Sequence, residues 1–182
     1  MTDKELLLDL FQTLADALRR TIQDLPLDIL RWQPDEEANN VAVTVWHISR
    51  AFDLFKVRFF EDRTPEEELW HAQGWAAKTG YDPRGIGGRG FGNLYGYTQE
   101  EVEAVPILPA EDLLAYFDQV YEAMIAYLHD LPAEMLYQPA AGSPIEEYTT
   151  YRWLRNLLVD GLAHWGEIKA ILHMWERRNR AA

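Results

Sequence analysis

The sequence predicts an all-α fold: a four-helix bundle with a long irregular insertion between the second and third helices. Four stretches carry apolar residues at the three- and four-residue spacing of helices, and capping residues and prolines mark their ends. The 182 residues, 48% of them hydrophobic, can bury a sizeable core. With no internal repeat and no linker in the sequence, we expect residues 1–182 to form a single domain.

The first helix is predicted from about Asp3 to Leu25. Thr2 or Asp3 can cap its start, and Pro26 ends it. Its core-facing stripe consists of Leu7, Leu10, Leu14, Leu18, Thr21 and Leu25.

The second helix is predicted to begin after Asn39 or Asn40 and to end near Asp62 or Arg63. Its apolar face consists of Val45, Ile48, Phe52, Phe55 and Phe59. His47 lies on an adjacent stripe, about one turn into the helix. We therefore expect its imidazole near one end of the bundle, where a ligand can enter.

The irregular insertion covers residues 64–109 and contains a glycine-rich stretch from Asp82 to Asn93. Glycines at this density indicate a loop. A phosphate-binding loop is disfavoured, because the stretch does not follow a clear strand, does not open a helix, and lacks Gly-Lys-Ser/Thr. Long loops in compact domains often cover a site, so we expect the loop 84–96 to act as a lid or cover.

The third helix is predicted from Pro109 or Ala110 to Leu131, and Pro132 ends it. Its apolar stripe consists of Leu113, Phe117, Val120, Met124 and Leu128.

The fourth helix is predicted from about Tyr151 to Arg178, with Thr149 or Thr150 as its cap. Leu, Ile, Val and Trp occur on nearly every side of its middle part, so we expect this helix to be buried almost all round.

A polar stripe interrupts this apolar helix at Asp160, His164 and Glu167, which are three and four positions apart and therefore share a face. Buried carboxylates require a partner. His47, from the second helix, is a candidate partner. His47, Asp160 and His164 would form a set of two histidines and one carboxylate, which suits zinc, nickel, manganese or ferrous iron.

Glu167 lies one turn beyond this set, where it can act as a hydrogen-bond acceptor behind a ligand or as a catalytic general base. The alternative explanation needs no metal: a backbone carbonyl or carboxylate satisfies each histidine, and Asp160 pairs with Arg50 or Arg155. The remaining histidines are weaker candidates. His173, nine residues beyond His164, lies on the opposite face of the helix.

These residues resemble the DinB-like superfamily of bacterial four-helix bundles. That family has one histidine on its second helix and roughly His-x-x-x-His-x-Gly-Gln on its last. Here the corresponding residues are His47 and then Asp160, His164, Gly166 and Glu167. Asp160 stands where the family usually has histidine, and Glu167 where it usually has glutamine. The resemblance covers most of the chain.

The resemblance implies a divalent metal and a role as a metal-dependent thiol transferase or isomerase, similar to the mycothiol-dependent maleylpyruvate isomerase. It also implies a homodimer. Because the chain has no cysteine, thiol chemistry would require an external low-molecular-weight thiol, and a hydrolase is the other enzymatic interpretation. The alternative is a non-catalytic bundle that binds a small ligand, or dimerises, without metal.

The formal net charge of −13 argues against a nucleic-acid partner, because binding to phosphates normally requires a basic surface. The basic cluster Arg177, Arg178 and Arg180 is explained by the negative end of the last helix. No apolar run approaches the roughly 20 residues of a membrane span, and no signal peptide is visible. We therefore expect a cytoplasmic protein with a small-molecule substrate or ligand and no membrane partner.

Overall fold

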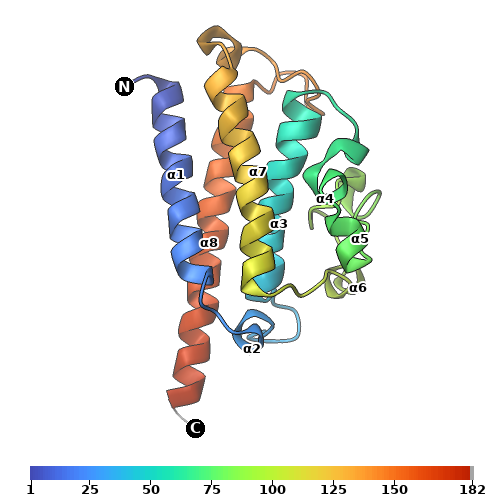
Figure 1. The fold of residues 1–182 in the computed structure, drawn as a ribbon, viewed down its shortest axis with the longest axis vertical. Helices are drawn as coiled ribbons and strands as arrows, with labels where there is room; N and C mark the ends of the chain where they lie inside the picture. Colours follow the sequence, from blue (N-terminus) through green and yellow to red (C-terminus); the bar gives the residue numbers. More distant parts are fainter. Residues whose placement is uncertain (181–182) are drawn as a thin grey trace.

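The computed structural model describes residues 1–180, and it confirms the predicted all-α fold. Four long helices lie side by side (Figure 1): α1 (Asp3–Ile22), α3 (Val41–Leu54), α7 (Ala110–Asp130) and α8 (Thr150–Arg180). Helix α3 packs against both α7 and α8, and α8 also packs against α1. Every helix within residues 1–180 is too short or too polar to cross a lipid bilayer.

Short helices occupy the connections between the long ones. They are α2 (Leu27–Leu30), the π-helix η1 (Phe55–Phe60), η2 (Pro65–Glu67), α4 (Leu69–Ala72), α5 (Trp75–Thr79), η3 (Gly88–Gly90), α6 (Gln99–Glu103) and η4 (Ala133–Tyr137). Elements η2 to α6 form the irregular insertion, which lies beside α3 (Figure 1).

The predicted caps hold α1 and α3 in place. The Thr2 hydroxyl accepts a hydrogen bond from the Glu5 backbone N–H, and the Glu5 carboxylate accepts one from the Thr2 N–H. Helix α1 ends at Ile22, three residues before the predicted Leu25. At α3, the Asn40 side chain accepts a hydrogen bond from the Val43 N–H at 2.9 Å.

The end of α3 departs from a regular α-helix. The chain continues from Leu54 as the π-helix η1 and stops at Phe60, slightly before the predicted end at Asp62 or Arg63. A π-turn inserts an extra residue into the helical repeat and so redirects the side chains that follow. In this turn the rings of Phe55 and Phe59 stack with centroids 4.8 Å apart.

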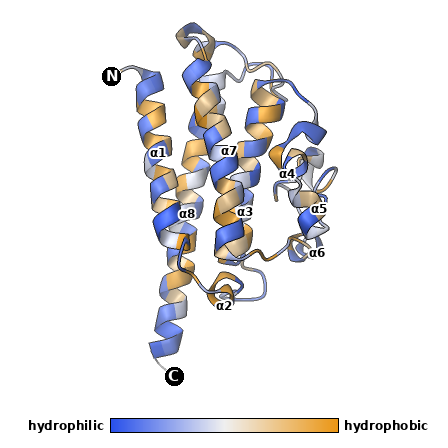
Figure 2. Ribbon diagram, in the orientation of Figure 1, coloured by the Kyte–Doolittle hydropathy of each residue, from blue (hydrophilic) through white to orange (hydrophobic). Residues whose placement is uncertain are grey.

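Helix α8 is not buried all round, contrary to the prediction. One side packs on α1 and α3, but Val159 and Leu162 on the other side are 61% and 40% exposed. The prediction was wrong because α8 is an outer helix, so apolar residues on its outer side face solvent. Its C-terminal part also extends beyond the other long helices and is largely hydrophilic (Figures 1 and 2).

A buried ionic network joins α3 to the insertion and to α7. The fully buried Arg50 guanidinium donates to Asp53 Oδ2 at 3.0 Å and to Glu68 Oε2 at 2.6 Å. The Asp53 carboxylate also accepts from the Tyr116 hydroxyl and from the first two backbone N–H groups of α4. Arg50 Nε donates to the carbonyl of Gly92 at 3.1 Å. This bond anchors residues 84–96, called the glycine-rich loop below.

Replacing Arg50 by methionine should lower the free energy of unfolding by about 3–5 kcal/mol, because it leaves the buried Asp53 without a cation and Glu68 with only the more distant Arg58. Urea denaturation measures the change. The control Arg20→Met, at an exposed position on α1, should change stability by less than about 0.5 kcal/mol. Equal stability of the two variants would contradict the structural role given to Arg50.

Candidate metal centre

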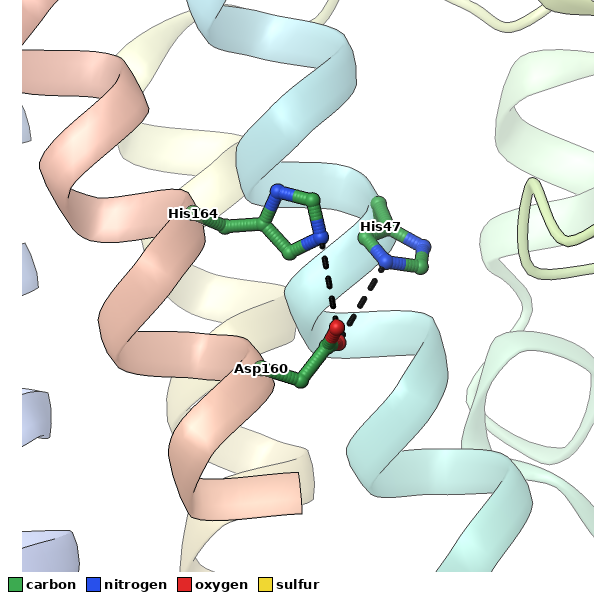
Figure 3. A group of neighbouring side chains, drawn as sticks. All are labelled: His47, Asp160 and His164. Carbon is green, nitrogen blue, oxygen red and sulfur yellow. Dashed lines mark ion pairs between the residues drawn. The ribbon is translucent and has the colours of Figure 1, made fainter. Parts of the chain in front are cut away.

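The structure brings together the three side chains that the sequence singled out. His47 comes from α3, and Asp160 and His164 come from successive turns of α8 (Figure 3). His47 Nε2 lies 3.5 Å from Asp160 Oδ2, and His164 Nε2 lies 3.5 Å from Asp160 Oδ1. One potential ligand atom from each residue lies within 4.8 Å of the other two. The two imidazole nitrogens and the carboxylate therefore face a common point.

Each imidazole is oriented through its other ring nitrogen. His47 Nδ1 contacts the backbone carbonyl of Asn93, and His164 Nδ1 lies 2.8 Å from Glu167 Oε2. Both partners are acceptors here, so both Nδ1 atoms carry the hydrogen. This leaves Nε2 of each ring as the atom available to a metal. Such an acceptor behind a histidine is the usual arrangement at protein metal sites.

The carboxylates around His164 determine its charge. Hydrogen bonding to Asp160 and to Glu167 raises the pKa of His164 to about 9. Partial burial works to raise the pKa of Asp160, but hydrogen bonds from His164 and His47 outweigh it and hold that pKa below its ordinary value. The bond to His164 likewise lowers the pKa of Glu167. Without metal, His164 is therefore a cation between two anions at neutral pH.

The three side chains line a cavity of about 560 Å³. This volume is within the usual range for small-molecule sites. Five aromatic side chains line part of the cavity: Phe55, Phe59, Phe91, Tyr95 and Trp153. Phe59 contacts both Phe91 and Trp153, so the rings from α3–η1, the loop and α8 form a continuous surface.

The glycine-rich loop forms one wall of this cavity, in the place expected of a cover. It contributes Arg89, Phe91, Asn93, Leu94 and Tyr95 to the lining. Asn93 carries no signal in the sequence, because its contact with His47 uses a backbone carbonyl that any residue has. Phe55 and Phe59 were predicted to belong to the apolar face of the second helix, but both line the cavity.

The alternative partners considered for Asp160 are engaged elsewhere. Arg50 binds Asp53, Glu68 and the Gly92 carbonyl, and Arg155 donates to its neighbour Asn156. Asp160 instead faces the two histidines. Its side chain remains 48% exposed, which leaves a route for an ion from solvent.

The donor set fits a divalent metal. Two neutral imidazoles and one carboxylate are ligands accepted by zinc, nickel, manganese and ferrous iron. Three protein ligands leave coordination positions for a further molecule, and the cavity provides the space beside them. A helical bundle that presents such a set inward from two facing helices belongs to a well-known class of metal-site architecture.

Comparisons with known proteins identify the family and the fold. The family model of the DinB superfamily matches residues 10–168, and the chain belongs to that superfamily. The crystal structure of a conserved protein from Enterococcus faecalis has the same fold, with a TM-score of 0.78 and 18% sequence identity. The match covers 96% of this chain and 97% of the other. No curated protein matches the sequence.

The raised pKa of His164 makes the stability of the metal-free protein depend on pH. A raised pKa stabilises the fold below the unfolded-state value of about 6.5, and this contribution is lost as the pH rises through about 9. We expect the free energy of unfolding of chelator-treated protein to fall over this range. His164→Gln should remove this part of the fall, whereas His173→Gln, at an exposed position of the same helix, should retain it. Parallel pH profiles for His164→Gln and the unmodified protein would contradict the assignment.

Proposed function

We propose that this protein binds a divalent metal ion through His47, Asp160 and His164 and acts on a small molecule held in the adjacent cavity. The observation that carries the proposal is the orientation of the two imidazoles. Each is held through Nδ1 by an oxygen acceptor, and each directs Nε2 toward the same carboxylate. Membership of the DinB superfamily supports the same interpretation.

A divalent cation at this place supplies Lewis acidity, which lowers the pKa of a coordinated water or thiol and polarises a carbonyl group. The protein's own residues do the positioning. The Asn93 carbonyl fixes the ring of His47, and Glu167 fixes the ring of His164. The aromatic walls exclude water from the substrate and hold its apolar part.

The reaction that we propose is a thiol transfer, an isomerisation or a hydrolysis. The chain has no cysteine, so the first two would use an external low-molecular-weight thiol. For Glu167, the contact with His164 and its place outside the cavity lining favour the orienting role over that of a general base. Glu167 is then a positioning residue, which acts on the substrate through His164.

A second candidate function is the binding of a small ligand without metal. The aromatic lining favours it, because such a surface retains an apolar molecule whether or not an ion is present. The two candidate functions differ in whether the protein binds a metal ion.

Metal analysis separates them directly. Protein equilibrated with zinc at neutral pH and then freed of excess ion should retain about one ion per chain, and His164→Ala should retain much less, because it removes one of three ligands. The matched control is His173→Ala on the same helix, which should behave like the unmodified protein. Equally low zinc in all three proteins would exclude the proposed centre and leave the ligand-binding function.

The positioning role of Glu167 is tested by Glu167→Gln. The amide retains an acceptor oxygen but removes the charge that makes His164 more basic, so zinc affinity should fall by about tenfold. Competition with a coloured chelator measures the affinity. Glu176→Gln, an exposed acid-to-amide change on the same helix, is the control. If the two variants bind zinc equally well, Glu167 does not support the centre.

A further inference from the structure

Arg89 is an exposed cation at the cavity that has no partner in the structure. It lies in the glycine-rich loop and lines the same cavity as His47, Asp160 and His164. Arg84, five residues earlier in the loop, is paired with Glu66 and Asp82. Within residues 1–180, by contrast, the Arg89 guanidinium forms no ion pair or hydrogen bond. Its five N–H donors are therefore available to a ligand.

The backbone of Arg89 is held in a conformation that favours glycine. Its φ is +57°, in the left-handed region, and Leu94 in the same loop has φ of +77°. A residue with a side chain pays a conformational cost there, and such residues concentrate at functional sites. Both residues line the cavity. Within the loop 84–96, the two non-glycine residues with positive φ are thus both residues that line the cavity; Asp62, outside the loop, is the third such residue in residues 1–180.

The charges around the cavity define what Arg89 can attract. Arg89 is the one arginine or lysine among the lining residues, and Asp160 is the one carboxylate. The imidazole of His164 is already flanked by Asp160 and Glu167. The chain as a whole has a net charge of −13, so an anion needs a local cation to bind here. One planar guanidinium matches one carboxylate group, which it can bind through two parallel hydrogen bonds. A phosphate dianion would leave a charge without a partner.

We propose that the cavity binds a small monocarboxylate with an apolar or aromatic body. Arg89 binds the carboxylate, and the body lies against the ring surface formed by Phe55, Phe59 and Trp153. This deepens the proposed function, because the remainder of such a molecule lies in the cavity that the metal ligands also line. The recognition of the carboxylate itself depends on Arg89 and requires no metal.

Phenylacetate and its neutral isostere phenylacetamide test the proposal by isothermal titration calorimetry on both chelator-treated and zinc-loaded protein. In the chelator-treated protein the acid should bind about tenfold more tightly than the amide, since the hydrogen bonds to Arg89 are charge-assisted. Arg89→Gln should abolish this preference, and Arg89→Lys should retain part of it. Arg20→Gln, which removes one positive charge from an exposed site on α1, should leave it unchanged.

Equal binding of acid and amide, or no saturable binding of the acid, would overturn the proposal. If Arg89→Gln still binds phenylacetate more tightly than phenylacetamide, but only when zinc is present, the metal binds the carboxylate instead of Arg89. That result would refute the role of Arg89 while supporting the metal centre. Conversely, a chain that binds no zinc but shows the Arg89-dependent preference would refute the proposed function and support this inference.

Arg89→Gly separates binding from folding. Glycine adopts the left-handed conformation without strain, so this variant should unfold at the same temperature as the unmodified protein or at a higher one. It should nevertheless lose the preference for phenylacetate. A lower melting temperature together with unchanged binding would show that Arg89 has a structural role.

Discussion

The buried guanidinium of Arg50 is the interaction on which the rest of the structure depends. It pairs with two buried carboxylates, and Arg58 adds a second, more distant cation at one of them, Glu68. The other, Asp53, also holds the start of α4 and the hydroxyl of Tyr116 on α7. The long bundle helices and the irregular insertion are thereby joined at one point. Buried ion pairs add little net stability compared with apolar packing, but they strongly penalise any arrangement that separates them. The network therefore specifies how the insertion lies against α3.

This constraint extends to the candidate metal centre through two successive peptide groups. Arg50 binds the carbonyl of Gly92, and His47, one turn earlier on α3, contacts the carbonyl of Asn93. Residues three apart on a helix share a face, so the helix presents both side chains to the same stretch of loop. The loop in turn covers the cavity with Phe91, Leu94 and Tyr95. A single contact region thus fixes the loop and orients a proposed metal ligand.

Much of the fold could be predicted from sequence because helical periodicity and caps are local signals. The Asn40 cap and the ends of α7 and α8 were identified to within a few residues. The polar stripe on α8 was visible for the same reason, since Asp160 and His164 are four apart. Their meeting with His47 could be expected from the bundle arrangement and from the resemblance to the DinB-like superfamily.

The remaining features depend on distant parts of the chain. Nothing local reveals that Arg50 pairs with Glu68, or that the Asn93 carbonyl meets His47, because each contact joins different elements. The π-turn at Phe55 is equally hidden, since the same apolar residues suit an ordinary α-helix. The exposure of Val159 was missed because an apolar side chain on an outer helix has the same sequence pattern as one in the core.

X-ray absorption spectroscopy of protein loaded with one equivalent of zinc tests the central claim most directly. The scattering pattern of imidazole rings distinguishes histidine ligands from water and carboxylate at similar distances of about 2.0–2.2 Å. We expect two imidazoles in the unmodified protein and one in His47→Ala, because the second ring then comes from His164 alone. A spectrum without imidazole, or one that His47→Ala leaves unchanged, would contradict a centre shared between α3 and α8.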